Sequence, residues 1–391
     1  MRVLLVAATT GYQTRAFSEV AHRIGFELVL ATDRCHVLED PWRDNAVALR
    51  FDEPDEGIEQ IVARGPFDGI AAVGDRPAYV AALAASRLGL PFSPPHAVLA
   101  TKNKFLARQK FRAQGLLTPG YELFNAPTGA RRYPCVLKPL GLSGSRGVIR
   151  ANDPAEFAAA FARIKQIAAE PSVLVEDFIP GHEYALEGIL TEGRLRALAL
   201  FDKPDLLDGP FFEETIYVTV PMDATIAETT QRAITALGLT QGPVHAEMRV
   251  NEEGVWMLEV AARPIGGLCS TVLRFRGGRT LEELILRHAV GEDVAEARLD
   301  EGAHAVMMIP IPRAGIYIGV SGVEDGCEVP GVEDIVITAK QGQEMLQLPE
   351  GASYLGFIFA RAETAEGAVQ ALRDAHSRLK FEFAAKLPVV K

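Results

Sequence analysis

The sequence predicts a multidomain protein of mixed α/β and α+β structure. The chain has 391 residues, which is more than one ordinary hydrophobic core accommodates and indicates about two or three domains. Its first part alternates short apolar runs with helical patterns, which is typical of a parallel sheet covered by helices. Its last part holds several strand patterns and one clear helical pattern. The predicted domains cover residues 1–95, residues 96–300 with a lid subdomain at about 130–176, and residues 301–391.

The composition excludes several classes of protein. A hydrophobic content of 48% and a charged content of 23% are those of a globular protein. The net charge of −11 argues against a nucleic-acid partner, although a local pocket can still bind a small anion. The cysteines lie far apart and indicate neither a disulfide framework nor a zinc site. Because the apolar runs are too short for a signal peptide or a membrane span, we expect a cytoplasmic protein without a membrane partner.

The first domain is expected to have a Rossmann-like architecture. Its strand and helix patterns repeat as strand–helix–strand units, which imply a parallel, doubly wound sheet. The turn AATTGYQTR lacks the G-x-G-x-x-G pattern, so we expect no dinucleotide there. The proline-rich stretch LPFSPPHAV marks the end of the domain. Strands are expected within residues 2–8, 26–32 and 67–74, and helices within residues 15–24 and 78–89.

The second domain opens with a basic helix over residues 102–115, in which Lys104 and Arg108 share one face. Another helix is expected to begin after Asp153, which can cap it. Strands are expected within residues 133–138 and 172–179, followed by a hairpin over residues 183–201. The third domain is expected to have strands within residues 305–311, 315–320, 334–339 and 353–362, and a helix within residues 364–379.

The hairpin HAEMRVNEEGVWMLEVAAR carries a pair of carboxylates. Glu247 and Glu259 face each other if the loop has an odd number of residues, and a loop of residues 252–254 with a left-handed Gly254 meets this requirement. Two carboxylates repel by roughly 4 kcal/mol at about 4 Å and an effective dielectric constant of about 20. A shared Mg²⁺ ion with ATP phosphates would relieve that repulsion. General acid–base use and a different register with two unrelated exposed glutamates are the alternatives.

The loop GLSGSRG follows the strand that ends at Lys138. Its glycines, including Gly144, let backbone N–H groups approach an oxyanion closely, and Ser143 and Ser145 add hydroxyl donors. With the charge of Lys138, this composition suits a polyphosphate. It is not a P-loop, because G-x-x-x-x-G-K-[ST] is absent. The alternative is an ordinary surface turn.

The stretch VLVEDFIPGHE suits a nucleoside. The backbone of Asp177, Phe178 and Ile179, after Glu176, would meet an adenine edge, and Glu183 would accept hydrogen bonds from ribose hydroxyls. The alternative is that these acids are solvated charges at a strand end.

Arg263 follows the second glutamate of the hairpin and precedes a Gly-Gly turn that begins at Gly266. An arginine fork beside a metal site can clamp a phosphoryl oxygen or a carboxylate. The alternative is a surface arginine.

In this order, these features resemble the ATP-grasp superfamily over about Pro95 to Glu292. The resemblance implies that two lysines and the glycine loop hold the ATP phosphates, that two glutamates bind Mg²⁺ or Mn²⁺, and that an arginine and backbone N–H groups hold the reacting acyl group. These residues are Lys104, Lys138, Ser143, Gly144, Ser145, Glu247, Glu259, Arg263 and Gly266. Lys102 is a rival to Lys104. Where many ATP-grasp enzymes have a further asparagine ligand, this chain has Ala261, so the number of metal ions is open.

A finer resemblance is to the L-amino acid ligases, in the carboxylate–amine ligase branch. It rests on FDKPDLLDGPFFEE, HAEMRV, EVAARPIGGLC and LPEGASYLGFIFARAET. It implies that ATP activates a carboxylate as an acyl phosphate and that an amine, in an amino acid, then displaces phosphate. Related ligases are commonly homodimers. Substrate contacts are expected from the loops at residues 206–214 and 265–270. The alternatives are a purine-pathway or bicarbonate substrate, and a nucleotide-binding module without catalysis.

Overall fold

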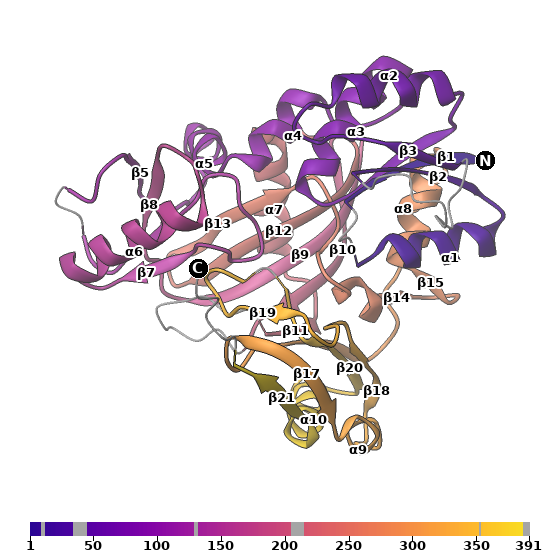
Figure 1. Ribbon diagram of the computed structural model, residues 1–391. Coiled ribbons are helices and arrows are strands. Elements are labelled where there is room, and N and C mark those ends of the chain that lie inside the picture. The colour runs from indigo at the N-terminus through magenta and orange to yellow at the C-terminus, as the bar shows by residue number, and fades with distance from the viewer. Residues whose placement is uncertain (9–11, 34–44, 129–131, 205–214, 352, 386–391) are drawn as a thin grey trace, which may run out of the picture.

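The computed structural model describes residues 1–8, 12–33, 45–128, 132–204, 215–351 and 353–385 (Figure 1). The first domain contains a parallel sheet in the order β3-β2-β1-β4, which confirms the predicted parallel α/β architecture. Its strands are β1 (Arg2–Ala7), β2 (Glu27–Thr32), β3 (Ala46–Ala48) and β4 (Gly69–Val73), and its helices are α1 (Thr14–Ile24), α2 (Asp55–Arg64) and α3 (Asp75–Leu88). The sequence patterns missed β3, which is very short, and α2.

The basic helix expected over residues 102–115 is present as the shorter α5 (Lys104–Ala113). A second helix that was not expected, α4 (Pro95–Lys102), precedes it. Asn103 separates them because its backbone is extended, with φ of −110°, and its side chain accepts a hydrogen bond from the Leu106 N–H at 3.1 Å. The structure thus uses Asn103 as an N-cap, which places Lys104 in the first turn of α5.

The expected lid is a small sheet with a core of its own. The antiparallel strands lie in the order β5-β8-β6-β7, and α6 packs on them. Asp153 caps α6 as predicted, accepting hydrogen bonds from the Ala155 and Glu156 N–H groups at 2.8 and 2.9 Å. The elements are β5 (Tyr121–Phe124), β6 (Cys135–Lys138), β7 (Ile149–Ala151), α6 (Pro154–Ile167) and β8 (Val173–Asp177).

The largest sheet has the strand order β13-β12-β9-β10-β11-β16-β20-β18. Its strands are β9 (His182–Thr191), β10 (Arg194–Asp202), β11 (Ile216–Val220), β12 (Gly242–Asn251), β13 (Gly254–Ala261), β16 (Ala303–Ile309), β18 (Val332–Ile337) and β20 (Gly356–Ala362). Strands β16, β18 and β20 of the third predicted domain therefore extend the sheet of the second. The predicted boundary near residue 300 falls between two strands of one sheet, and it stays a prediction.

The remaining elements are helices and short strands outside the large sheet. They are α7 (Ala224–Leu237), η2 (Cys269–Val272), β14 (Arg274–Phe275), β15 (Arg279–Thr280), α8 (Leu281–Ala289), β17 (Gly315–Ser321), α9 (Val323–Cys327), β19 (Glu344–Met345), α10 (Ala365–Arg378) and β21 (Lys380–Ala384). Strands β19, β17 and β21 form a separate small sheet, and α10 packs against β16 and β20. Figure 1 shows the first domain, the lid and the C-terminal block as three lobes around the long strands.

The hairpin of β12 and β13 pairs Glu247 with Glu259, as predicted, but not for the predicted reason. Asn251 pairs with Gly254, so the loop has only two residues rather than the predicted three. The register shifts between Glu247 and Met248, which makes Leu258 the extra residue of a β-bulge. The bulge, rather than the loop, supplies the odd residue that brings the two glutamates opposite each other.

Candidate active site

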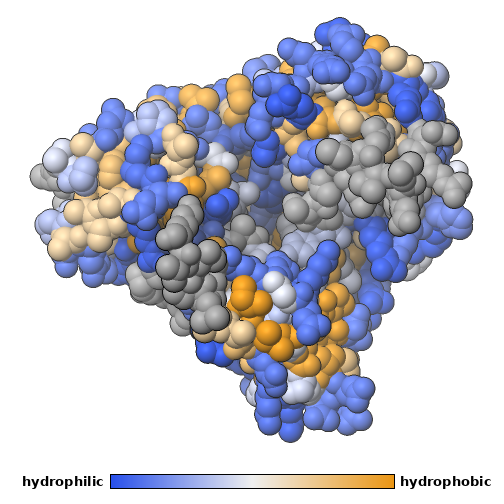
Figure 2. All heavy atoms as spheres, in the orientation of Figure 1, coloured by the Kyte–Doolittle hydropathy of each residue, from blue (hydrophilic) through white to orange (hydrophobic). Residues whose placement is uncertain are grey.

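A cavity of about 660 Å³ lies between the lobes, and Figure 2 shows the surface hollowed there. The carboxyl ends of the parallel strands face it through Ala8 after β1, Asp33 after β2 and Asp75 after β4. This is the edge at which α/β sheets usually bind ligands. Every candidate residue also lines the cavity: Lys104, Lys138, Ser143, Gly144, Ser145, Glu176, Asp177, Phe178, Ile179, Glu183, Glu247, Glu259, Arg263 and Gly266. Their individual roles remain predictions.

The glycine loop is built to turn tightly. Gly144, Ser145 and Gly147 have φ of 63°, 54° and 71°, in the left-handed region where glycine is favoured. At the start of the loop, Glu170 accepts hydrogen bonds from the Leu140 and Gly141 N–H groups at 2.6 and 3.0 Å. The loop is therefore held at its base, and its serines face the cavity.

The C-terminal block touches the lid at the other end of this loop. The Gly147 N–H donates to the Pro349 carbonyl at 3.0 Å. Arg163 on α6 forms a bidentate ion pair with Glu350, in which Nη2 lies 2.8 Å from Oε2. These contacts link the glycine loop to a segment about two hundred residues further along the chain.

The two predicted phosphate-binding lysines come from different elements. Lys104 donates to the Leu142 carbonyl of the glycine loop, and its Nζ lies 3.9 Å from Oε2 of Glu259. Lys138 lies at the end of β6. Lys102 instead places its Nζ 5.1 Å from the Tyr79 ring, and among the described residues it does not line the cavity. The geometry therefore favours Lys104 over Lys102.

The Glu176 side chain forms ion pairs within the protein. Its buried carboxylate lies 2.6 Å from Nε of the fully buried Arg108 and 2.8 Å from Nζ of Lys138. Burial alone would raise the pKa of Glu176, but Arg108 and Lys138 lower it to about 2. The ion pair fixes the end of Lys138, while residues 177–179, at the end of β8 and just after it, line the cavity.

Glu183 also lies within a cationic environment. Its Oε1 accepts from Lys203 Nζ at 2.9 Å, and its Oε2 accepts from Arg249 Nε at 3.0 Å. All three side chains are buried. A ribose hydroxyl would therefore share these oxygens with the two cations.

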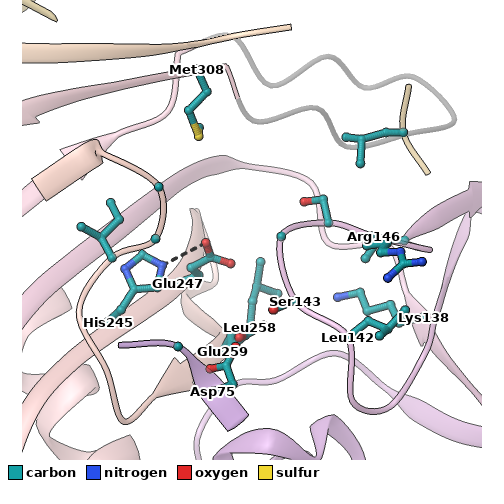
Figure 3. A pocket seen from close by; sticks show the side chains of 18 of the residues that line it. Asp75, Lys138, Leu142, Ser143, Arg146, His245, Glu247, Leu258, Glu259 and Met308 are labelled. Carbon is teal, nitrogen blue, oxygen red and sulfur yellow. Dashed lines mark hydrogen bonds and ion pairs between the residues drawn. The ribbon is translucent and has the colours of Figure 1, made fainter. Parts of the chain in front are cut away.

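Charged side chains of alternating sign form a hydrogen-bonded row that includes Glu247. Its Oε1 accepts from Lys203 Nζ at 2.9 Å and from His245 Nε2 at 3.2 Å, the contact drawn in Figure 3. His245 Nδ1 hydrogen-bonds Glu187, whose Oε2 accepts from the Ile265 N–H at 3.0 Å. Burial alone would lower the pKa of His245, but Glu187 and then Glu247 raise it to about 9. The two carboxylates therefore favour the protonated form of the His245 imidazole.

The facing carboxylates fit a divalent cation. Burial would raise the pKa of Glu247, but Lys203 and His245 hold it well below its ordinary value, so the carboxylate is charged. Both cations contact Oε1, which leaves Oε2 uncommitted to them. Carboxylate oxygens suit Mg²⁺, which usually completes its shell with phosphates and water. Within the described part of the chain, no group of three or more His, Cys, Asp or Glu side chains could hold a metal, so any ion here would rest on two carboxylates and on ligands from outside the chain.

Arg263 is paired with a residue that the sequence did not reveal. Its Nε donates to Oδ1 of Asp75 at 3.0 Å, and its Nη1 donates to the Pro264 carbonyl at 3.0 Å. Sequence reasoning likewise assigned no role to Lys203, His245 and Glu187. For Asp75 a signal existed, because it follows a strand of a parallel sheet at the carboxyl edge.

One wall of the cavity is apolar. Tyr12, Met308, Ile311 and Tyr354 line it, and Figure 3 shows Met308 directed toward His245 and Glu247. This wall belongs to the first domain and the C-terminal block. The predicted substrate loop at residues 206–214 lies outside the described residues.

Profiles of known families match three segments of the chain. They are the ATP-grasp N-terminal domain at residues 18–92, the ATP-grasp domain at residues 131–272, and the L-amino acid ligase C-terminal domain 2 at residues 307–384. An L-amino acid ligase from Bacillus licheniformis has a similar structure, with a TM-score of 0.82, 24% identity, and coverage of 98% of this chain and 99% of that one. At this identity the likeness concerns the fold.

Two curated relatives are similar in sequence. Dapdiamide A synthase from Enterobacter agglomerans is 28% identical over 43% of this chain and 43% of its own length. A formate-dependent phosphoribosylglycinamide formyltransferase from Cupriavidus metallidurans is 28% identical over 76% of this chain and 69% of its own. The chain spans only 60%, 43% and 33% of three curated relatives, dapdiamide A synthase among them. In the described residues, no helix is long and apolar enough to cross a membrane.

Proposed function

The chain is a member of the ATP-grasp superfamily of ligases, and on this premise we propose that it joins the carboxylate of one small amino acid to the amine of another. The L-amino acid ligase C-terminal domain at residues 307–384 and the 28% identity with dapdiamide A synthase support this class of substrates. We also propose that the protein acts in the cytoplasm as a homodimer, and that residues 1–95, 96–300 and 301–391 are its domains.

The proposed reaction has two steps. A carboxylate oxygen attacks the γ-phosphorus of ATP, the bond from that phosphorus to the bridging oxygen breaks, and ADP leaves. The neutral amine of the second substrate then attacks the acyl carbon, and the carbon–oxygen bond to phosphate breaks. The amine loses one proton as the amide forms, and inorganic phosphate is released.

The chain's charges suit the first step. Lys104, Lys138 and the glycine loop would offset the charge that spreads over the γ-phosphate oxygens. Glu247 and Glu259 would hold Mg²⁺ or Mn²⁺, which neutralises phosphate charge when bound. The backbone of residues 177–179 would orient the adenine, and Glu183 the ribose.

The second step needs an acyl group protected from water. Arg263 and the N–H groups near Gly266 would hold the acyl phosphate and the oxyanion that follows it. The lid has its own core, so it can move as a unit and exclude water. The single observation that carries the proposal is that the two glutamates face each other in a cavity lined by both lysines and the arginine.

The test measures ADP, inorganic phosphate and pyrophosphate across all pairwise amino-acid combinations with Mg²⁺ and ATP. We expect ADP and phosphate in equal amounts with an active pair, and a matching amount of dipeptide. Glu259→Gln should fold normally and lose at least about 100-fold in kcat, whereas Glu228→Gln on the exposed face of α7 should not change it. Pyrophosphate would indicate adenylation instead, and nucleotide binding without turnover of any pair would contradict catalysis of this class.

One alternative has specific support. The similarity to a formate-dependent phosphoribosylglycinamide formyltransferase extends over 76% of this chain, which favours formate or another purine-pathway carboxylate as substrate. Turnover with formate, bicarbonate or a ribonucleotide amine, but with no amino-acid pair, would establish this alternative.

A further inference from the structure

The first domain contributes one charged side chain to the centre of the site. Asp75 occupies the first turn of α3, directly after β4. Gly74 makes the turn between them with φ of 98°, a conformation that few other residues adopt. Figure 3 shows Asp75 beside Glu259 and near Ser143 of the glycine loop. The fold therefore places a carboxylate of the first domain where phosphate chemistry is expected.

Asp75 contacts Arg263 along one edge of the guanidinium. Arg263 Nε lies 3.0 Å from Oδ1, and Nη2 lies 3.5 Å from Oδ2. The side chains of Arg263 and Asp75 are only 11% and 21% exposed. Arg263 Nη1 donates to its neighbour's carbonyl at 3.0 Å. A guanidinium has five N–H donors in a fixed plane, so these contacts fix that plane and leave further donors for a ligand.

We propose that Asp75 is a positioning residue, which orients Arg263 so that its other N–H groups meet the phosphoryl group of the reacting acyl phosphate. The inference rests on the proposed function, since it assigns Arg263 to that group. Ser143 of the glycine loop lines the same cavity as Asp75 and lies near it in Figure 3. Asp75 thus aligns the arginine from a domain that otherwise provides none of the predicted phosphate ligands.

A second possible role of Asp75 predicts the opposite change in the affinity for phosphate. In this alternative, Asp75 has no positioning role. It is an anion that competes with phosphate and occupies Arg263 until phosphate arrives. Removing its charge would then strengthen phosphate binding, since the site becomes more positive. Positioning predicts weaker phosphate binding despite the added positive charge. The two roles are therefore distinguished by whether the affinity for phosphate falls or rises when the charge of Asp75 is removed.

The first experiment titrates inorganic phosphate calorimetrically into the protein with ADP and Mg²⁺ bound. We expect the affinity to fall in the order wild type, Asp75→Asn, Asp75→Ala, with a loss of at least about tenfold in the last. Asp52→Asn is the matched control, because Asp52 forms an exposed ion pair with Arg76 at 2.6 Å in the same domain. An unchanged or tighter affinity in both Asp75 variants overturns the proposal.

The second experiment separates positioning from general stability. Arg263→Lys keeps the charge but removes the planar fork, so it should weaken phosphate binding to a similar extent. If Asp75 acts through Arg263, adding Asp75→Asn to Arg263→Lys causes no further loss. A fully additive loss in the double variant overturns the proposal.

Turnover provides the third readout. With an active amino-acid pair, Asp75→Asn should lower kcat by about 100-fold, leave the KM for ATP within about threefold, and leave Asp52→Asn at the wild-type rate. An Asp75→Asn variant with the wild-type kcat overturns the proposal. If the wild type turns over no amino-acid pair, the proposed function fails, while the phosphate titration still decides the role of Asp75.

Discussion

Replacing Glu176 with glutamine should cost a large part of the stability of the lid. Glu176 is 1% exposed and lies between Arg108, which is fully buried, and Lys138. Glu176→Gln keeps the shape but leaves the buried guanidinium without its counterion. Breaking one partner of a buried ion pair usually costs about 3–5 kcal/mol.

The pKa of Glu176 gives a second route to this magnitude. The pKa falls from 4.5 to about 2 on folding, and each unit corresponds to about 1.4 kcal/mol, so the carboxylate contributes about 3 kcal/mol. A carboxyl group with a lowered pKa stabilises the folded state fully above its unfolded pKa. That contribution is lost as the pH falls from about 4.5 toward 2. Both routes therefore give about 3 kcal/mol at pH 7.

The assay is urea unfolding of the wild type, Glu176→Gln and the exposed control Glu228→Gln at several pH values. We expect Glu176→Gln to lower the free energy of unfolding by about 3 kcal/mol at pH 7. The difference from the wild type should narrow as the pH falls below 4.5, because the wild type then loses the same charge. A difference below about 1 kcal/mol at pH 7, or one that does not vary with pH, would refute the reasoning.

Three further outcomes are expected. Lys104→Met should raise the KM for ATP by at least about tenfold, whereas Lys102→Met should leave it within about twofold. Equal effects of the two substitutions would contradict the preference for Lys104 over Lys102. Arg163→Ala should loosen the contact between lid and C-terminal block, so that more phosphate is released per amide formed; an unchanged ratio would show that this ion pair does not help to exclude water. Removing divalent cations with a chelator should abolish ADP formation, and adding Mg²⁺ should restore it. Full activity in the presence of the chelator would contradict the proposal that Glu247 and Glu259 bind a metal ion.

The sequence could predict those parts of the site whose signals are local. Such signals lie beside the glycine loop, beside Lys138 at the end of its strand, and beside Glu176 and Glu183 in the nucleoside stretch. In each case the neighbouring residues indicate a strand end or a turn. The parallel sheet of the first domain and the cap of α6 at Asp153 could also be predicted, because hydrophobic periodicity and helix capping depend on residues that are close together in the sequence. The parallel sheet and the cap were confirmed, whereas the roles of the site residues stay predictions.

Partners that are distant along the chain could not be predicted. Arg263 and Asp75 are 188 positions apart, and Lys203 and Glu247 are 44 apart. Nothing beside Lys203 or His245 distinguishes a buried cation from a solvated one. The β-bulge at Leu258 also leaves no local trace, because Leu258 is apolar like its neighbours, and so the register was right while the loop was wrong.

The long sheet that passes from the second predicted domain into the third limits how the chain can be divided. β11 pairs with β16 through Ile216–Met307, Tyr217–Val306 and Val218–Ala305. A chain cut near residue 300 would lose this partner and leave a row of unpaired backbone N–H and C=O groups on an apolar edge. Such edges recruit other chains. The shortened protein should therefore aggregate rather than yield a smaller nucleotide-binding unit, and its C-terminal block is part of the framework rather than an appendage.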